Sequence, residues 1–226
     1  MNIFLLIFSV VLGTLLVMAL KPTTKVIQIL LAFSGAYLLS ITALHLLPEV
    51  FETGKNHIGV YILLGVLIQT VLEFFSKGAE HGHIHSHPFE KGVPWLLLLS
   101  LCLHAFLEGI PLGNAQNHVL LWAIVVHKIP VSTVLYIFLI HAKLPVKYIF
   151  GILTVFALMS PAGLLFSEAP WLIEHQAEIT AVIIGVFLHI SAAILFESSQ
   201  NHQFNIRKFV AVLLGFFVAF ISTQLH

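Results

Sequence analysis

The sequence contains no aspartate and a single cysteine, Cys102, among its 226 residues. One cysteine excludes an intramolecular disulfide framework and a cysteine-rich metal site. Charged residues make up only 9% of the chain, and their formal net charge is zero. No basic stripe or aromatic-basic module is present, so nothing indicates nucleic-acid binding. With 59% hydrophobic residues and a mean hydropathy of +1.03, the chain is also too apolar for a soluble globular domain.

Long apolar segments recur from one end of the sequence to the other, and each approaches the roughly 20 residues with which a helix crosses a bilayer. Backbone groups in lipid must be hydrogen-bonded within a helix or a closed barrel, and no alternating ten-residue strands appear. The first segment lacks a basic leader and a cleavage site, so we interpret it as a spanning helix. The eight expected spans are residues 2–20, 25–48, 57–76, 93–113, 117–141, 146–167, 176–198 and 206–224. The sequence therefore predicts one all-α integral membrane domain over residues 1–226.

Basic residues are distributed unevenly over the expected connecting loops. Lys and Arg in short loops are retained on the cytoplasmic side of a membrane. If the N-terminus is outside, the outer loops carry only Lys55. The inner loops then carry Lys21, Lys25, Lys77, Lys91, Lys143, Lys147, Arg207 and Lys208. Because the opposite orientation would reverse this distribution, we expect a multi-pass protein of the cell membrane with both termini outside.

The most informative stretch is an apolar run in the fourth expected span that contains a histidine and a carboxylate. His104 and Glu108 are four residues apart, so they share one face of a helix. The fifth expected span places His127 beside Lys128 in another apolar run. Both histidines lie about 11 residues from the start of their spans, near mid-bilayer at about 1.5 Å per residue. Facing pairs at the midplane are where transporters bind their substrates.

Ionisable groups inside a membrane are energetically expensive, so they indicate a functional site by default. Imidazole and carboxylate ligands together suit Zn²⁺, Fe²⁺, Mn²⁺ or Cd²⁺ better than Mg²⁺ or Ca²⁺. We therefore interpret His104, Glu108 and His127 as ligands of a transported metal ion. The alternative interpretation is a hydrogen-bonded polar network that holds the helices together.

Two other spans carry histidine and glutamate that are candidates for the metal pathway. His45 and Glu49 near the outer end of the second span form either a transient ion site or a satisfied interfacial pair. His189 and Glu197 lie eight residues apart in the seventh span, and Glu73 lies near the inner end of the third. Taken alone, each of these last three is better explained as a snorkelling or capping residue than as a ligand.

The longest expected loop, at about residues 77–92, is cytosolic in this topology and contains four alternating histidines. Such a composition is typical of metal binding, although a solvated linker is the simpler alternative. We expect an exposed loop of this kind to bind metal weakly and exchange it quickly. The four residues are His81, His83, His85 and His87.

Four motifs together resemble the ZIP (Zrt/Irt-like) family of divalent-metal transporters. They are His-Leu-Leu-Pro-Glu at 45–49, His104-Ala-Phe-Leu-Glu108-Gly109, His127-Lys128-x-Pro130 and Ser160-Pro161-Ala162-Gly163, in the order of the family. Eight spans, outer termini and a histidine-rich loop after the third span also agree. The resemblance implies a 3+2+3 bundle, in which spans one to three and six to eight are inverted repeats around spans four and five. It also implies that metal moves into the cytosol.

The resemblance further implies how many metal ions the midplane site holds. In two-metal members, the first site has a carboxylate four residues after the second histidine, where this chain has Val131. The second site uses the positions held here by Ala105, Lys128 and Ser160. The chain is thus similar to the single-metal branch of the family. We expect the ammonium of Lys128, near Glu108, to stand in for the second metal ion; snorkelling elsewhere is the alternative.

The sequence is best interpreted as an importer of Zn²⁺ or a related divalent cation, with no cofactor and no enzymatic activity. An intramembrane metalloenzyme is the main alternative, since two imidazoles and a carboxylate also describe an open zinc site. Against it, no His-Glu-x-x-His motif occurs. A metal exporter is a third hypothesis. The expected partners are the metal ion and the lipid bilayer, and the sequence leaves open whether the chain forms a homodimer.

Overall fold

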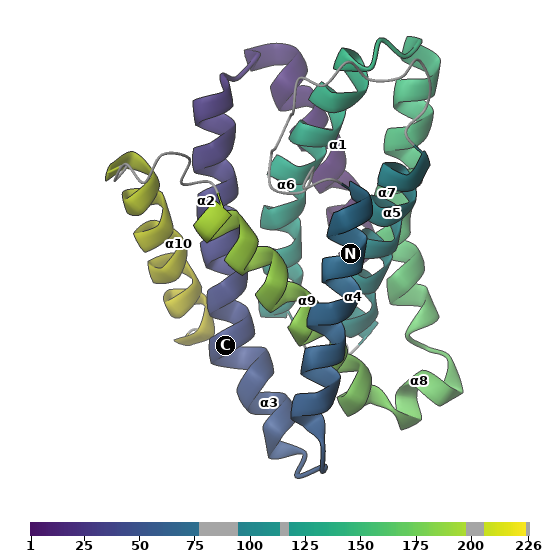
Figure 1. The fold of residues 1–226 in the computed structure, drawn as a ribbon, viewed down its shortest axis with the longest axis vertical. Helices are drawn as coiled ribbons and strands as arrows, with labels where there is room; N and C mark the ends of the chain where they lie inside the picture. The colour runs from purple at the N-terminus through teal and green to yellow at the C-terminus, as the bar shows by residue number, and fades with distance from the viewer. Residues whose placement is uncertain (77–94, 114–117, 198–205, 225–226) are drawn as a thin grey trace.

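The helices of this protein carry apolar side chains on their outer faces as well as between them. In the computed structural model, which describes residues 1–76, 95–113, 118–197 and 206–224, Phe4, Leu63 and Phe217 are each more than 60% exposed. Exposed apolar surface of this extent is what a hydrocarbon environment requires, because lipid rather than water solvates it. The helical bundle, drawn as a ribbon in Figure 1, therefore has the exposed apolar side chains of a membrane protein.

All regular structure in the described residues is helical. The helices are α1 Asn2–Leu20, α2 Thr24–Ile41, η1 Thr42–Leu46, α3 Leu47–Glu52, α4 Ile58–Ser76, α5 Trp95–Gly109, η3 Ile110–Gly113, α6 His118–His141, α7 Val146–Phe166, α8 Pro170–Glu174, α9 Gln176–Glu197 and α10 Ile206–Gln224. Among them are eight candidate membrane spans. The fold class and the number of spans predicted from the sequence are thus confirmed, and an even number of spans places the two ends of the chain on the same side.

Two local features depart from the expected spans. The second span continues through a turn of π-helix, η1, and ends at Glu52 rather than near residue 48. Residues 168–175, expected as a plain connector, contain the short helix α8, which begins with Pro170 at its first position. Proline favours that position because its missing N–H would be unsatisfied there in any case. Both α3 and α8 lie at the same end of the bundle (Figure 1).

The helices pack in pairs, and one exchange of spans converts these pairs into one another. The four most extensive pairings are α4 with α9, α10 with α2, α1 with α6 and α5 with α7. Exchanging the first three spans with the last three, and α5 with α6, converts the first pairing into the second and the third into the fourth. This is the pairing that inverted repeats around a central helix pair produce.

Each of these four pairings contains a glycine where two backbones approach closely. A Cβ atom at the glycine would collide with a backbone carbonyl oxygen of the facing helix. Small residues permit such close helix contacts in membranes, where packing replaces the hydrophobic effect as the driving force. The glycines are Gly65 in α4 against α9, Gly215 in α10 against α2, Gly13 in α1 against α6, and Gly109 and Gly163 between α5 and α7.

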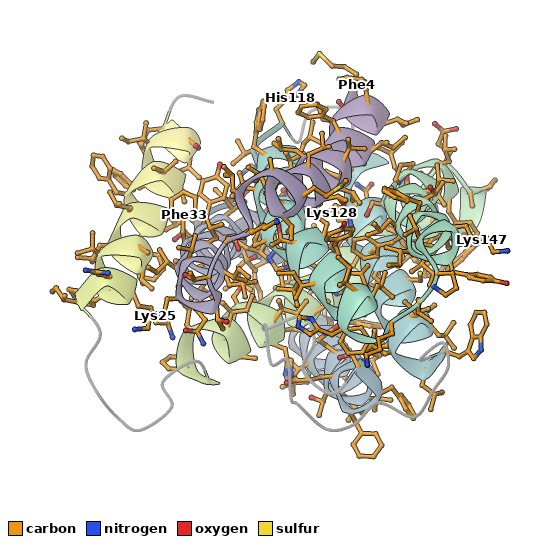
Figure 2. All side chains as sticks on the ribbon, turned by 90° about the horizontal axis from the view of Figure 1, so that it is seen from above. Phe4, Lys25, Phe33, His118, Lys128 and Lys147 are labelled. Atoms are coloured by element: carbon orange, nitrogen blue, oxygen red, sulfur yellow. The ribbon has the colours of Figure 1, made fainter. Side chains whose placement is uncertain are left out.

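The helix α6 is the most enclosed of the spans. Of its apolar 18-residue stretch, 72% is buried, against 17% for α10. Figure 2 shows Lys128 of α6 well inside the bundle, whereas Lys25 and Lys147 reach its outside. The fold therefore encloses His127 and Lys128 of α6 within the bundle.

Candidate metal site

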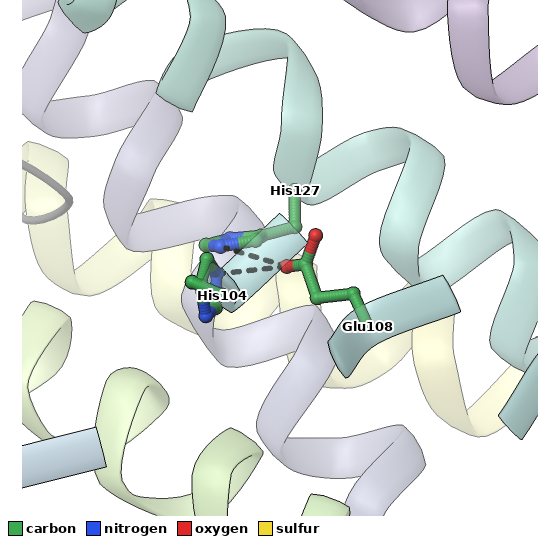
Figure 3. A group of neighbouring side chains, drawn as sticks. All are labelled: His104, Glu108 and His127. Atoms are coloured by element: carbon green, nitrogen blue, oxygen red, sulfur yellow. Dashed lines mark ion pairs between the residues drawn. The ribbon is translucent and has the colours of Figure 1, made fainter. Parts of the chain in front are cut away.

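Helices α5 and α6 bring two histidines and one glutamate together inside the bundle. His104 and Glu108 lie one turn apart on α5, and His127 faces them from α6 (Figure 3). Among the described residues, these three form the one group of metal-ligating side chains whose ligand atoms all lie within 4.8 Å of one another. The sequence predicted this grouping from helical spacing and from the similar depth of the two histidines.

The separations within the group suit a small metal ion. The Oε1 atom of Glu108 lies 3.0 Å from His104 Nε2 and 3.7 Å from His127 Nε2. Zinc binds such atoms at about 2.0–2.2 Å, so the corners of a tetrahedral site are roughly 3.4 Å apart. Both measured separations are within about 0.5 Å of that value. The two imidazole rings are nearly perpendicular, with an interplanar angle of 84° and centroids 6.2 Å apart, so they approach the carboxylate from different directions.

The other oxygen of Glu108 contacts a buried lysine. Lys128 Nζ lies 3.0 Å from Glu108 Oε2, and it also lies 4.7 Å from the centre of the Phe156 ring in α7. His104, Glu108 and Lys128 are each 1% exposed, and His127 is fully buried. A buried charge is tolerated only when it is paired. The carboxylate therefore has two sides: Oε1 faces the imidazoles, and Oε2 faces the ammonium, which is stabilised further by the aromatic ring.

A family model described as ZIP zinc transporter matches residues 80–223. The chain belongs to the ZIP zinc transporter family. A relative by sequence is Zinc transporter ZIP1 of Danio rerio, which is 30% identical over 147 residues. That match covers 60% of this chain and 49% of the relative, so the chain spans about half the length of the curated protein it matches. Family membership and the eight apolar helices together make it a multi-pass integral membrane protein.

The positions that two-metal ZIP proteins use for further ligands have other contacts here. Ala105 is buried and offers no side-chain ligand, and Val131 packs in an apolar cluster with residues of α5 and α7. The hydroxyl group of Ser160 donates a hydrogen bond of 2.5 Å to the backbone oxygen of Ala105. Among the histidine, cysteine and carboxylate side chains that the structure describes, this site is therefore formed by the two imidazoles and Oε1 of Glu108, and the ammonium of Lys128 contacts the other oxygen, Oε2.

The other predicted pathway residues are not part of this ZIP site. His45 is half-buried in η1, and Glu49 is exposed in α3. His189 lies in α9, and Glu197 is the last residue of that helix. The four histidines of the loop at 77–92 lie outside the described residues, so a metal-binding role for them stays a prediction.

One contact was missed by sequence reasoning. The sequence was interpreted with Glu73 and His189, each taken alone, as snorkelling or capping residues rather than ligands, and it did not indicate that Glu73 Oε2 contacts His189 Nε2 between α4 and α9. These residues are 116 positions apart, and nothing in either apolar segment indicates which faces meet. The only signal in the sequence was that each is a polar residue in the inner half of a span.

Charge is segregated between the two ends of the protein. Basic residues at the end that contains the α1–α2 and α6–α7 connections are Lys21, Lys25, Lys143, Lys147, Arg207 and Lys208. Acidic residues at the opposite end, near α3 and α8, are Glu49, Glu52, Glu168, Glu174 and Glu178, with Lys55 as the basic residue among them. Lys55 is paired with Glu178 at 2.9 Å, so the described part of this end remains strongly acidic.

Proposed function

We propose that this ZIP family protein moves a divalent cation, Zn²⁺ or a close chemical relative, across the cell membrane into the cytosol. The observation that carries the proposal is the group of His104, Glu108 and His127, buried midway along two adjacent spans. His104 is the tenth of 19 residues in its span, and His127 is the tenth of 24. A ligand set of two imidazoles and a carboxylate at this depth replaces the water that a metal ion loses in lipid.

The segregation of charge supports the proposed direction of transport. Basic residues in short connections stay on the cytoplasmic side, so the end with Lys21 and Lys143 is placed in the cytosol and both termini are placed outside. The acidic end then faces outward, where its negative potential raises the local concentration of cations. We infer that metal enters at the acidic end and leaves at the basic end.

A cavity at the acidic end supports this route. It has a volume of about 240 Å³ and lies between η3, the end of α7 and the start of α9. Pro111 of η3 lines it, three residues after Glu108 along the same chain segment, and Glu168 lies on its wall. On this wall of the cavity, Pro111 is therefore about one helical turn from Glu108.

The charges of Glu108, Lys128 and the metal ion would allow the site both to bind the ion and to release it. Without metal, Lys128 neutralises Glu108, so the buried group carries no net charge. A divalent ion that binds on the Oε1 side adds its charge next to the ammonium, and their repulsion limits the affinity, which favours release. Three protein ligands also leave a coordination position open through which water can exchange. Family membership favours transport over an intramembrane metalloenzyme with the same ligands.

Uptake of Zn²⁺ into proteoliposomes loaded with a fluorescent indicator would test this proposal. We expect His127→Ala and Glu108→Gln to abolish uptake, because removing one of three ligands forfeits much of the binding free energy. The matched control is His141→Ala, which removes an exposed imidazole from the end of the same helix as His127. Competition by Fe²⁺, Mn²⁺ and Cd²⁺ would rank the substrates. Uptake at the wild-type rate in His127→Ala and Glu108→Gln would refute the site.

A further inference from the structure

A second contact between an imidazole and a carboxylate lies within the membrane-spanning helices, outside the group of His104, Glu108 and His127. Glu73 of α4 and His189 of α9 meet through Oε2 and Nε2, and their side chains are about one-fifth exposed. The other ring nitrogen, His189 Nδ1, lies 3.4 Å from the hydroxyl oxygen of Thr70 in α4. The contact therefore joins two helices that the fold already packs closely together.

The contacts of this cluster restrict where its hydrogen atoms can lie. The hydroxyl of Thr70 donates to the backbone oxygen of Val66 at 2.8 Å, so toward His189 its oxygen can only accept. If His189 Nδ1 donates a hydrogen to this oxygen, the lone pair of Nε2 faces the carboxylate of Glu73. Two electron-pair donors in contact require a cation between them, which is either a proton or a metal ion.

The packing of α4 against α9 does not by itself explain this pair. Gly65 of α4 meets Val182 and Gly185 of α9 in the same way as Gly215 of α10 meets Phe33 and Ala36 of α2. Counting along the helices from these matching contacts, the positions equivalent to Glu73 and His189 are Thr223 and Ser40.

At the equivalent place, the two hydroxyl side chains bond within their own helices. Ser40 donates to the oxygen of Ala36 at 3.0 Å, and Thr223 donates to the oxygen of Phe220 at 2.8 Å. The seam between α2 and α10 thus forms without an imidazole and a carboxylate at this position. The pair between α4 and α9 occurs in only one of the two repeats, on the side that we assign to the cytosol.

The pair lies on the cytosolic side of the midplane group. Ser100 of α5 donates a hydrogen bond of 2.5 Å to the backbone oxygen of Leu72, so this turn of α4 is level with Ser100. Ser100 precedes His104 by four residues, which corresponds to about 6 Å along a helix. In the sequence, Glu73 is also followed within 14 residues by the four loop histidines, His81 to His87.

We propose that Glu73 and His189 form a second, weaker site for the same class of divalent cation, which accepts the ion after it leaves His104, Glu108 and His127. This inference rests on the proposed function for its direction of transfer. The donor atoms, one imidazole nitrogen and one carboxylate oxygen, are those of the midplane group and select the same borderline ions. Two protein ligands instead of three, completed by water, give a lower affinity, as an ion in transit requires.

The test measures Zn²⁺ binding to the purified full-length chain by equilibrium dialysis. The background variant carries His104→Ala and His127→Ala together with serine at the four loop histidines, so that the other two groups of histidines are removed. Glu108 and Lys128 remain paired in it. We expect about one Zn²⁺ per chain to remain, with an affinity that falls at least about tenfold on adding His189→Ala. Ser40→Ala, at the equivalent position of the other repeat, is the matched control and should leave binding unchanged.

Two results would overturn the inference: absence of bound Zn²⁺ in the background variant, or residual binding that His189→Ala does not weaken. If His189→Ala lowers the unfolding temperature and leaves residual Zn²⁺ binding intact, the pair serves only to join α4 and α9. Glu73→Gln, which keeps the size of the side chain, repeats the test if His189→Ala does not fold. Failure of the proposed function is seen separately, as undiminished uptake in His127→Ala with all other residues native.

Discussion

The pairing of Glu108 with Lys128 predicts that each side chain depends on the other for stability, whereas only Glu108 is a metal ligand. Their charged atoms are 3.0 Å apart, and both side chains are 1% exposed. Removing one member of such a buried pair leaves the other charge uncompensated and costs about 3–5 kcal/mol. For a chain of this size each kcal/mol lowers the unfolding temperature by about 2–4 °C. We therefore expect Lys128→Ala and Glu108→Gln each to lower that temperature by roughly 6–20 °C.

The double variant Glu108→Gln with Lys128→Met should recover most of this loss. Neutral side chains of similar volume often replace a buried ion pair without net destabilisation. Metal binding should not recover, because the carboxylate ligand is gone. For the wild-type protein, Zn²⁺ at about 100 times its dissociation constant adds about 2.7 kcal/mol, which raises the unfolding temperature by roughly 5–11 °C. The double variant should lack this increase.

Thermal unfolding of the four proteins in detergent, with and without Zn²⁺, measures both effects. The control is Lys55→Met, which breaks a contact of 2.9 Å between Lys55 and Glu178, where Lys55 is 42% exposed. An exposed ion pair contributes about 1 kcal/mol or less, so this variant should unfold close to wild type. If the double variant is as unstable as the sum of its single variants, the two buried charges are not coupled. If Glu108→Gln keeps the full Zn²⁺ effect, Glu108 is not a ligand.

Three further predictions concern other parts of the chain. Replacing the four loop histidines by serine should leave uptake by proteoliposomes near the wild-type rate, because a loop does not form the midplane barrier, and complete loss with normal membrane insertion would contradict this. In a chain that lacks those histidines and also carries His189→Ala, metal titration should count one ion, bound by the midplane group. Adding Lys128→Asp with Ala105→Asn should admit a second ion. Two ions without these two substitutions would disprove the role of Lys128. Gly163→Leu should prevent α5 from approaching α7, since a Cβ there would meet the backbone oxygen of Phe106. Its control, Gly151→Leu, extends into open space and should fold. Size-exclusion chromatography would distinguish the two variants.

Much of the candidate site was predictable from the sequence because helical geometry is rigid. The spacing of His104 and Glu108 places them on one face of a helix wherever that helix packs. The depth of His127 follows from its distance to the end of an apolar segment of known length. The nearness of Lys128 to Glu108 was expected because Lys128 directly follows His127 inside the bilayer, and the structure has the two charged groups 3.0 Å apart. The sequence did not indicate that Phe156 contacts the ammonium of Lys128, since one phenylalanine among 19 does not stand out in an apolar chain.

The sequence by itself determined the number, length and helical nature of the spans. Lipid leaves a spanning backbone no alternative to internal hydrogen bonding, so apolar length alone is decisive. Only the tertiary structure decided which faces meet. In a soluble helix the polar face identifies the outside, but here both faces of a span are apolar, and its hydrophobic periodicity carries little information. The close approach of α4 to α9 and of α5 to α7 occurs at glycines, and the contacts of Glu73 with His189 and of Lys128 with Phe156 join two different helices. Each is a property of a pair of helices and not of either segment alone.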